Sequence, residues 1–394
     1  MVGMTARRPA EGTPPGLPDG DWGAGRMPAV DNLKVLLIGT VIVIHGVMSY
    51  AAFFDGWPYA DVQEVHLPDA VVIAVFALFA PVGLFMMALL FLVAGLLTTP
   101  SVDRKGSAGF ARDRLLRLGV PFAAFVLLLW PTTLYAMYRG LGRTRAGYWA
   151  YFTHAWPDNG PLWFVGFLLL LSLGYAIWRG IRRDASRPVR PITTAGLLAV
   201  AAVVAATSFL VRLAVSYAGP TPLDLNEWQW PECVALFAVG VLAAPHGWLA
   251  AVPAGLLRTA RRVTALTGAA VAVFLLTALA LGVRREDFLG GLHWPALVVA
   301  GLEGLLTVFG SIWLLGVAQL RLNRWSVSGP MLARSAYPAF ILQSPVLIGL
   351  AVALRPLPVD AEVKATVVAV GGLVLSFWLG RLIVSRLRPT SRVL

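Results

Sequence analysis

The sequence has little charge. Only 13% of its 394 residues are Asp, Glu, Lys or Arg, whereas 58% are apolar and the mean hydropathy is +0.74. Soluble globular chains are about 25% charged, so these charges are too few to cover a water-facing surface. Several apolar stretches are as long as the roughly 20 residues that a helix needs to cross a bilayer. The composition therefore excludes a soluble enzyme and predicts an all-α integral membrane protein.

Cysteine and a secretion signal are also lacking. Cys233 is the single cysteine, which excludes a disulfide framework and a thiolate metal site, and we expect no metal. Residues 1–30 contain Arg7, Arg8, Pro and Gly but no apolar run, so we expect no cleavable signal peptide here. We predict a disordered cytoplasmic tail over 1–30, a membrane domain over 31–387 and a short cytoplasmic tail over 388–394.

Ten apolar runs separated by polar, Pro-rich or Gly-rich breaks predict ten membrane spans. They are Leu33–Phe54, Ala70–Leu97, Leu115–Tyr138, Leu162–Trp178, Thr194–Ser216, Trp230–Ala244, Val263–Val283, Ala296–Ala318, Tyr337–Ala353 and Val363–Val384. The sixth is the weakest because it is short and is followed by Pro245 and Pro253. Its end could instead belong to a re-entrant or interfacial segment.

The net charge of +12 is explained by topology. Lys and Arg concentrate in cytoplasmic loops of membrane proteins. With both termini inside, the ten-span arrangement places 24 basic residues in inner segments and 7 in outer loops. Removing the sixth span worsens the split to 18 against 13. We therefore favour ten spans with cytoplasmic termini and a multi-pass protein of the cell membrane, in contact with lipid and with no nucleic acid as partner.

One histidine lies within a predicted span. His45 stands about midway along the first span, and Asp31 and Lys34 stand at its cytoplasmic end. Eleven residues turn a helix by about three full turns and raise it by about 16 Å, so Lys34 and His45 share one face with Asp31. His45 is either a hydrogen-bonded structural residue beside a snorkelling Lys34, or a general base or proton relay, because imidazole titrates near neutrality.

Two further charged residues are predicted inside the membrane. Glu303 lies near the middle of the eighth span beside Gly301 and Gly304, and we expect it to pair with His45 or with an arginine. Arg212 lies near the outer end of the fifth span, where we expect it to snorkel.

Three arginines gather where the third span begins. Arg112, Arg114 and Arg117 fan over the start of the predicted helix after an inner loop. Such a cluster usually contacts lipid headgroups and stops transfer. It would also suit the phosphates of an anionic cytosolic cofactor, which Arg binds by bidentate hydrogen bonds.

These residues together resemble the acyltransferase 3 family of polytopic membrane acyltransferases. The resemblance runs from about Asp31 to Leu387. The family's first span carries Arg, ten residues and His, where this chain has Lys34 and His45. The family's Arg-x-Arg before a Leu-x-x-Pro step is similar to RDRLLRLGVP in this chain, and its Leu-Trp-Phe motif is similar to the segment at Trp163. Near the end of the chain, SAYPAFILQSPVLI resembles the family's Tyr-x-x-Tyr-Leu-x-His-x-Pro segment. Gln343 departs from this pattern, since many members have His there.

The resemblance implies an enzyme that moves an acyl group from cytosolic acyl-CoA to a hydroxyl of a carbohydrate or lipid-linked acceptor. It is nearest the glucan-modifying branch, and it implies acyl-CoA as a co-substrate with no tightly bound cofactor. We expect the CoA phosphates on Arg112, Arg114 and Arg117, His45 as the base and Lys34 beside the donor. Supporting positions are Asp31, Trp163, Glu303 and Gln343. The alternative is a polytopic transporter or flippase without acyl transfer.

Overall fold

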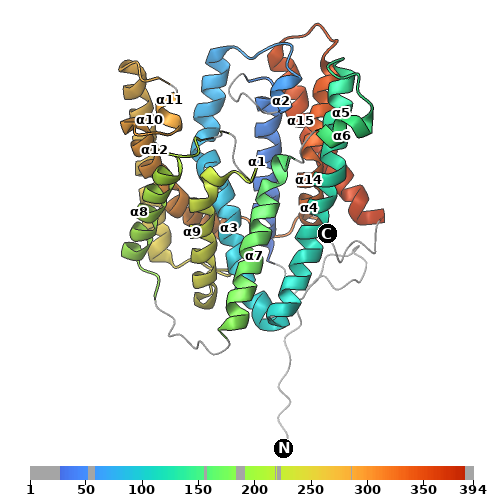
Figure 1. Cartoon of the computed structure of the whole chain (residues 1–394). Coiled ribbons are helices and arrows are strands. Elements are labelled where there is room, and N and C mark those ends of the chain that lie inside the picture. The colour runs from blue at the N-terminus through green and yellow to red at the C-terminus, as the bar shows by residue number, and fades with distance from the viewer. Residues whose placement is uncertain are drawn as a thin grey trace, which may run out of the picture.

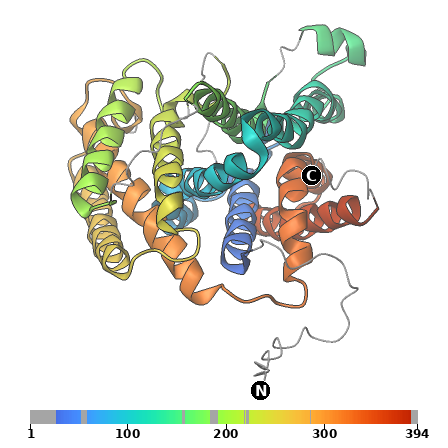
Figure 2. The same ribbon diagram turned by 90° about the horizontal axis from the view of Figure 1, so that it is seen from below.

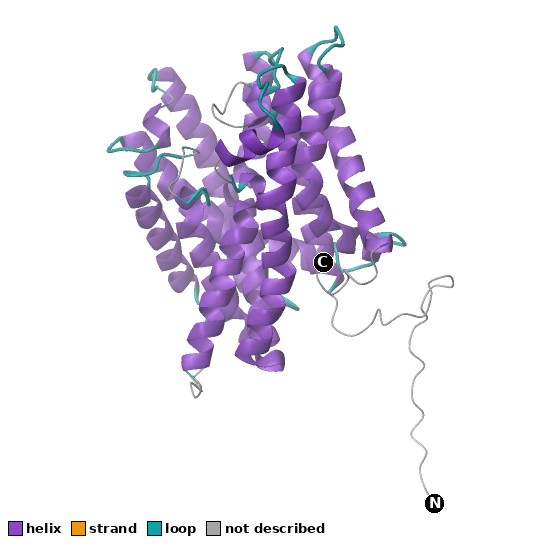
Figure 3. Cartoon of the chain, turned by 45° about the vertical axis from the view of Figure 1, so that its right-hand side comes forward, coloured by secondary structure: helices purple, strands orange, loops and turns teal. Residues whose placement is uncertain are grey.

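The protein is helical throughout the part of the chain that its computed structural model describes. The described residues are 27–51, 58–154, 158–182, 191–217, 219, 223–284 and 286–386. Figure 3 shows helices and connecting loops and no strand among these residues. The predicted all-α class is therefore confirmed. The predicted C-terminal tail and residues 1–26 of the N-terminal tail lie outside the described residues.

Fifteen α-helices, with short 3-10 and π-helical turns between some of them, make up the described chain. They are α1 Pro28–Met48, α2 Pro58–Asp61, α3 Asp69–Arg114, α4 Val120–Ala124, α5 Trp130–Gly140, α6 Tyr148–His154, α7 Trp163–Ile181, α8 Thr194–Val211, α9 Trp230–Ala243, α10 Ala254–Ala280, α11 Glu286–Leu289, α12 Trp294–Leu305, α13 Ser311–Arg321, α14 Gly329–Leu354 and α15 Ala361–Arg386. Proline, whose missing N–H costs nothing in the first turn of a helix, stands in the first two positions of α1, α9, α12 and α14.

Eight helical stretches in the described residues are long and apolar enough to cross a membrane. Two features separate this number from the ten predicted spans. The stretch Phe85–Gly140 holds parts of the second and third predicted spans, because helical structure continues through the turn between them. The sixth predicted span, α9, has only 14 residues, or about 21 Å, against a hydrocarbon core of about 30 Å. The count of ten and the orientation of the termini stay predictions.

The turn between the second and third predicted spans lies at Gly106. Gly106 has a φ of 71° inside the element labelled α3, a conformation that only glycine adopts without strain. The chain then runs back across the bundle through α4 and α5 (Figure 1). Two π-helical turns, Leu115–Gly119 and Phe125–Leu129, interrupt the α-helical structure of this segment. We call the end of the bundle where α1 begins the inner end, following the predicted topology, and the opposite end the outer end.

α3 and α1 occupy the middle of the bundle. Seen from below, α1 lies between α3 and the pair α14 and α15, while α8, α10 and α12 lie beyond α3 on the other side (Figure 2). α1 packs on α14 and α15, and α3 packs on α7 and α9. Gly95 and Gly240 meet at the contact between α3 and α9, where a Cβ on either glycine would overlap the backbone of the other helix.

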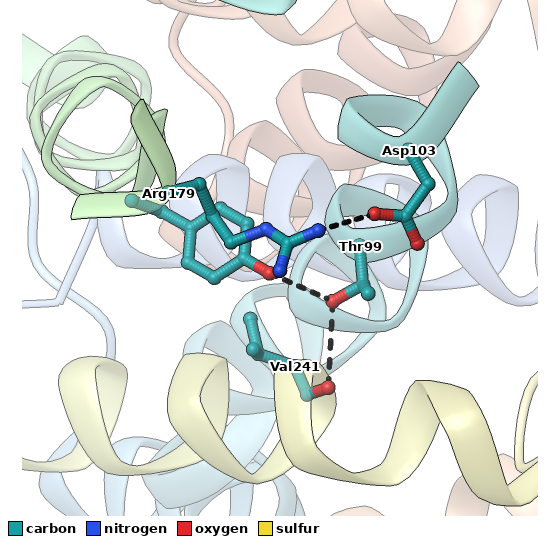
Figure 4. A network of polar contacts seen from close by, with 5 residues as sticks. Thr99, Asp103, Arg179 and Val241 are labelled. Atoms are coloured by element: carbon teal, nitrogen blue, oxygen red, sulfur yellow. Dashed lines mark hydrogen bonds and ion pairs between the residues drawn. The ribbon is translucent and has the colours of Figure 1, made fainter. Parts of the chain in front are cut away.

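A polar network ties α3 to α7 and α9 near the inner end. Arg179 Nη2 and Asp103 Oδ1 lie 2.6 Å apart, and the Thr99 hydroxyl lies 3.4 Å from the carbonyl oxygen of Val241 (Figure 4). The same hydroxyl lies 3.3 Å from that of Tyr175. These contacts hold α3 just before the Gly106 turn, and so fix the segment that leads to the arginine cluster.

The outer helices expose apolar side chains. Leu266, Leu276 and Leu279 of α10 are 72%, 68% and 79% exposed. A soluble protein avoids such contiguous apolar surface, whereas a lipid-facing helix requires it. The protein is accordingly a multi-pass membrane protein.

Candidate active site

His45 lies at the end of α1. It stands in the last turn of the helix, so the expectation that it lies midway along the first span is wrong. The helix ends because the chain turns at Ser49 and Tyr50 instead of continuing to Phe54. Gly46 beside it packs against the backbone of Ala369 in α15. As a whole residue His45 is half-buried, and its ring nitrogen Nδ1 is buried.

α14 brings two polar side chains to this level of the bundle. Gln343 and Ser344 are both completely buried, between the internal prolines Pro338 and Pro345. Each proline lacks the N–H that the carbonyl one turn earlier would accept, which locally loosens the helix. Gln343 approaches His45 within reach of a side-chain hydrogen bond.

The short helix α2 adds a tyrosine from the first outer loop. The Tyr59 hydroxyl donates to Ser344 Oγ at 2.6 Å. The ring centroids of Tyr59 and His45 are 5.8 Å apart. Tyr59 is 5% exposed, so the outer loop covers the end of α1. Burial and the nearby charge of Asp158 raise the pKa of Tyr59 above its usual value, and its hydroxyl therefore stays a hydrogen-bond donor.

These four residues, His45, Tyr59, Gln343 and Ser344, form one cluster, which we call the histidine site. It combines the imidazole of a half-buried histidine with amide and hydroxyl groups in a largely apolar setting. An imidazole can take a proton from a hydroxyl group, and neighbouring N–H or O–H groups can stabilise the charge that develops. The arrangement is therefore suited to acyl transfer chemistry.

The inner end of α1 carries the predicted polar pair. Lys34 Nζ lies 3.6 Å from Asp31 Oδ1, three residues apart on one face. Asn32 ties the same turn to the loop after α13, donating to the carbonyls of Leu322 and Arg324 at 2.8 and 2.9 Å. The shared face of Asp31 and Lys34 is confirmed, and the helix start is held firmly against the bundle.

The predicted arginine cluster lies at the inner end but does not form one stripe. Arg112 is exposed, and Arg117 Nε lies 3.1 Å from Asp113 Oδ1. The Arg114 guanidinium lies 4.8 Å from the centroid of the Phe110 ring, and its buried Nε has no hydrogen-bond partner. Arg114 is the most enclosed of the three arginines.

Glu303 pairs with an arginine, one of the two alternatives predicted. Arg212 and Glu303 form a bidentate ion pair with N···O distances of 2.6 and 2.8 Å. Their side chains are 2% and 1% exposed, so the expectation that Arg212 snorkels is wrong. α8 ends just before Arg212, and Gly304 lets α12 approach α8 closely enough for the pair to close. This ion pair belongs to α8 and α12, whereas the histidine site belongs to α1, α2 and α14.

Trp163 begins α7 as predicted and packs in an apolar cluster with Phe91, Phe167 and Phe237. In the nearby outer loop, the pKa of Asp224 is raised to about 7. Partial burial is the largest cause, and the side-chain hydrogen bond with Asp158 and the charge of Asp158 raise it further. Within the described parts of the chain, no group of three or more His, Cys, Asp or Glu side chains is placed to hold a metal ion.

The family model of acyltransferase 3, described as an acyltransferase domain, matches residues 27–384. The chain belongs to the acyltransferase 3 family. It is therefore an acyltransferase, and the matched range includes the histidine site, the arginine cluster and the Arg212–Glu303 pair. No curated protein and no solved structure matches the chain significantly.

Sequence reasoning on this acyltransferase missed two features. Tyr59 lies in a loop whose path no local pattern predicts, and only its contact with Ser344, 285 residues away, reveals it. Lys364 is the second residue of the last predicted span, Val363–Val384. Its ammonium, 2% exposed, pairs with Glu64 of the first outer loop. A lysine at the end of a predicted span, together with an acidic outer loop, is the sequence pattern that could have indicated this ion pair.

Proposed function

We propose that this acyltransferase moves an acyl group from cytosolic acyl-CoA to a hydroxyl group of a carbohydrate or lipid-linked acceptor. The observation that carries the proposal is the histidine site, where the one histidine of α1 meets hydrogen-bonding side chains from α2 and α14. The glucan-modifying branch, O-acylation and action at the cell envelope are part of the same proposal, as is a location in the cell membrane.

The donor would bind from the inner end. Arg112, Arg114 and Arg117 offer guanidinium groups for the phosphates of acyl-CoA. Arg114 supports this role because its Nε is buried and has no hydrogen-bond partner. Lys34 stands at the same end of α1, and its rise of about 16 Å to His45 gives the acyl-bearing arm of the donor a path along one helix face.

The reaction would occur at His45. The imidazole takes the proton of the acceptor hydroxyl as its oxygen attacks the thioester carbon. The thiolate of CoA leaves and takes that proton from the imidazolium. Donor and acceptor thus exchange an acyl group and a proton, and the enzyme returns to its starting state.

His45→Asn tests this proposal. Asn keeps a hydrogen-bonding side chain but cannot bind a proton near neutral pH. In membranes of a strain lacking the native gene, we expect the variant to insert and bind acyl-CoA normally. Transfer of label from radiolabelled acetyl-CoA should fall by at least about 100-fold. Near-normal transfer by His45→Asn, or absence of CoA-dependent transfer by the unaltered protein, would refute the proposal, and the latter result would favour a transporter.

Lys34 separates donor binding from chemistry. Lys34→Arg restores the residue type of the family and keeps the positive charge, so we expect it to retain most activity. Lys34→Gln removes the charge beside Asp31, and we expect a raised KM for acyl-CoA with a smaller change in kcat. A fall in kcat alone would place Lys34 in the chemical step instead.

A further inference from the structure

Gln343 is a buried amide whose N–H groups donate to no other part of the fold. Its side chain is 0% exposed, and neither its amide nitrogen nor its amide oxygen has a hydrogen-bond partner at good distance and angle. Buried polar groups are nearly always hydrogen-bonded because leaving them unpaired is costly. An amide held in this state calls for an explanation from function.

Another glutamine of the same bundle shows the contrast. Gln319 of α13 donates from Nε2 to the carbonyl of Trp248 at 2.7 Å and accepts from the backbone N–H of Val252 at 2.8 Å. Its amide fixes the loop before α10 and is fully occupied. Gln343 makes no such bonds, although its neighbour Ser344 accepts a hydrogen bond from Tyr59.

The position of Gln343 relative to His45 identifies what its amide can do. The two side chains approach within reach of a hydrogen bond. A carbonyl attacked by a hydroxyl beside His45 becomes a tetrahedral intermediate with a negative oxygen. Such an oxygen needs an N–H donor that already points into the site before the reaction begins. The Gln343 amide nitrogen is buried at the histidine site and donates to no other group there.

We propose that Gln343 is a catalytic residue whose Nε2–H group donates to the oxyanion formed during acyl transfer; this inference rests on the proposed role of His45 as the base. The acceptor oxygen bonds to the thioester carbon, and His45 takes the hydroxyl proton. The carbonyl electron pair moves onto its oxygen, which Gln343 holds. The pair then returns, the carbon–sulfur bond breaks, and the CoA thiolate takes the proton from His45.

Three substitutions at position 343 separate donation from packing. Gln343→Leu keeps the size and removes the donor. Gln343→His supplies a ring N–H in its place. Gln343→Glu keeps the shape, but its ionised carboxylate accepts hydrogen bonds and does not donate them. Gln319→Leu is the matched control, because the same change there removes hydrogen bonds that hold the fold.

The experiment measures transfer from radiolabelled acetyl-CoA in membranes holding equal amounts of each full-length protein, with the melting temperature of each purified protein alongside. We expect Gln343→Leu to lower kcat by about 100-fold or more, the loss typical of one oxyanion donor. The KM for acetyl-CoA should change by less than about threefold, and the melting temperature should not fall. Gln343→His should retain activity within about tenfold of the unaltered protein. Gln343→Glu should lose activity as pH rises, because ionisation removes its donor.

Gln319→Leu should behave in the opposite way, with a lower melting temperature and an unchanged kcat for the protein that remains folded. Gln343→Leu with kcat within about threefold of normal would overturn the inference, as would a loss that merely follows lost fold or lost CoA binding. If the unaltered protein transfers no label, or if His45→Asn remains active, the proposed function fails and this inference fails with it. Label transfer that requires His45 and tolerates Gln343→Leu overturns the inference alone.

Discussion

The Arg212–Glu303 ion pair provides a quantitative test of the fold. The two side chains meet through two N···O contacts of 2.6 and 2.8 Å and are almost completely buried. The Arg212 guanidinium also lies 4.8 Å from the centroid of the Tyr217 ring. A second buried carboxylate, Glu232 of α9, is 1% exposed and lies within electrostatic reach of Arg212. It accepts a hydrogen bond from Thr307 at 3.2 Å.

The second carboxylate predicts an order of effects. Breaking a buried ion pair by removing one partner costs about 3 to 5 kcal/mol, because the remaining charge is left uncompensated. Glu303→Gln should cost less than this, because removing the Glu303 charge leaves Glu232 as a carboxyl group that can ionise beside Arg212. Glu303→Gln combined with Glu232→Gln should cost the full amount of about 3 to 5 kcal/mol. Arg212→Met combined with Glu303→Leu should recover most of the loss, because apolar replacement of a buried pair is often neutral.

Unfolding by SDS in mixed micelles, followed by tryptophan fluorescence, measures these free energies. The control is the ion pair of the exposed Arg284 with the partly buried Asp287, 3.2 Å apart, where Arg284→Met should change stability by about 0.5 kcal/mol or less. If the single and double carboxylate variants are equally stable, Glu232 does not share the charge of Arg212. If both lie within about 1 kcal/mol of the unaltered protein, the pair does not form.

Three further predictions concern other parts of the molecule. Replacing Arg112, Arg114 or Arg117 by Gln should weaken acyl-CoA binding measured by calorimetry, with the largest loss at Arg114. Lys at the same positions should restore binding only partly, because it lacks the bidentate hydrogen-bonding geometry of Arg. Full restoration by Lys at all three positions would mean that only charge matters. The pKa of Asp224 in the folded protein is about 7, above its usual value, so the protonated carboxyl stabilises the outer loop. This stabilisation should be complete below pH 4 and should be lost as pH rises through 7. Hydrogen exchange of the loop should show this pH dependence, and Asp224→Asn should abolish it. Gly46→Ala should destabilise the protein by about 1 to 3 kcal/mol, since the added Cβ would lie 2.6 Å from Cα of Ala369; an unchanged melting temperature would contradict the close packing of α1 on α15.

The helices of this protein follow from local pattern. Apolar runs predicted α7, α8 and α15 nearly as the structure has them, because a helix in lipid must satisfy its hydrogen bonds within its own segment. The spacing of Asp31 and Lys34 likewise fixed their contact, since residues three apart on a helix are neighbours. His45 and the arginine cluster stand out in the sequence itself; resemblance to the acyltransferase 3 family added their expected roles in acyl transfer, and the family match confirmed the class of enzyme.

The partners of the polar groups were decided by the tertiary structure. Arg212 finds Glu303 across 91 residues, and Tyr59 finds Ser344 across 285. Hydropathy and spacing describe one helix at a time, so they placed Arg212 near a surface and left Tyr59 in a loop. Which helix faces which depends on close approach at Gly46, Gly95 and Gly304 and on where the chain turns back. Those contacts join segments far apart in the chain, and only packing the whole bundle brings His45, Gln343 and Tyr59 to one place.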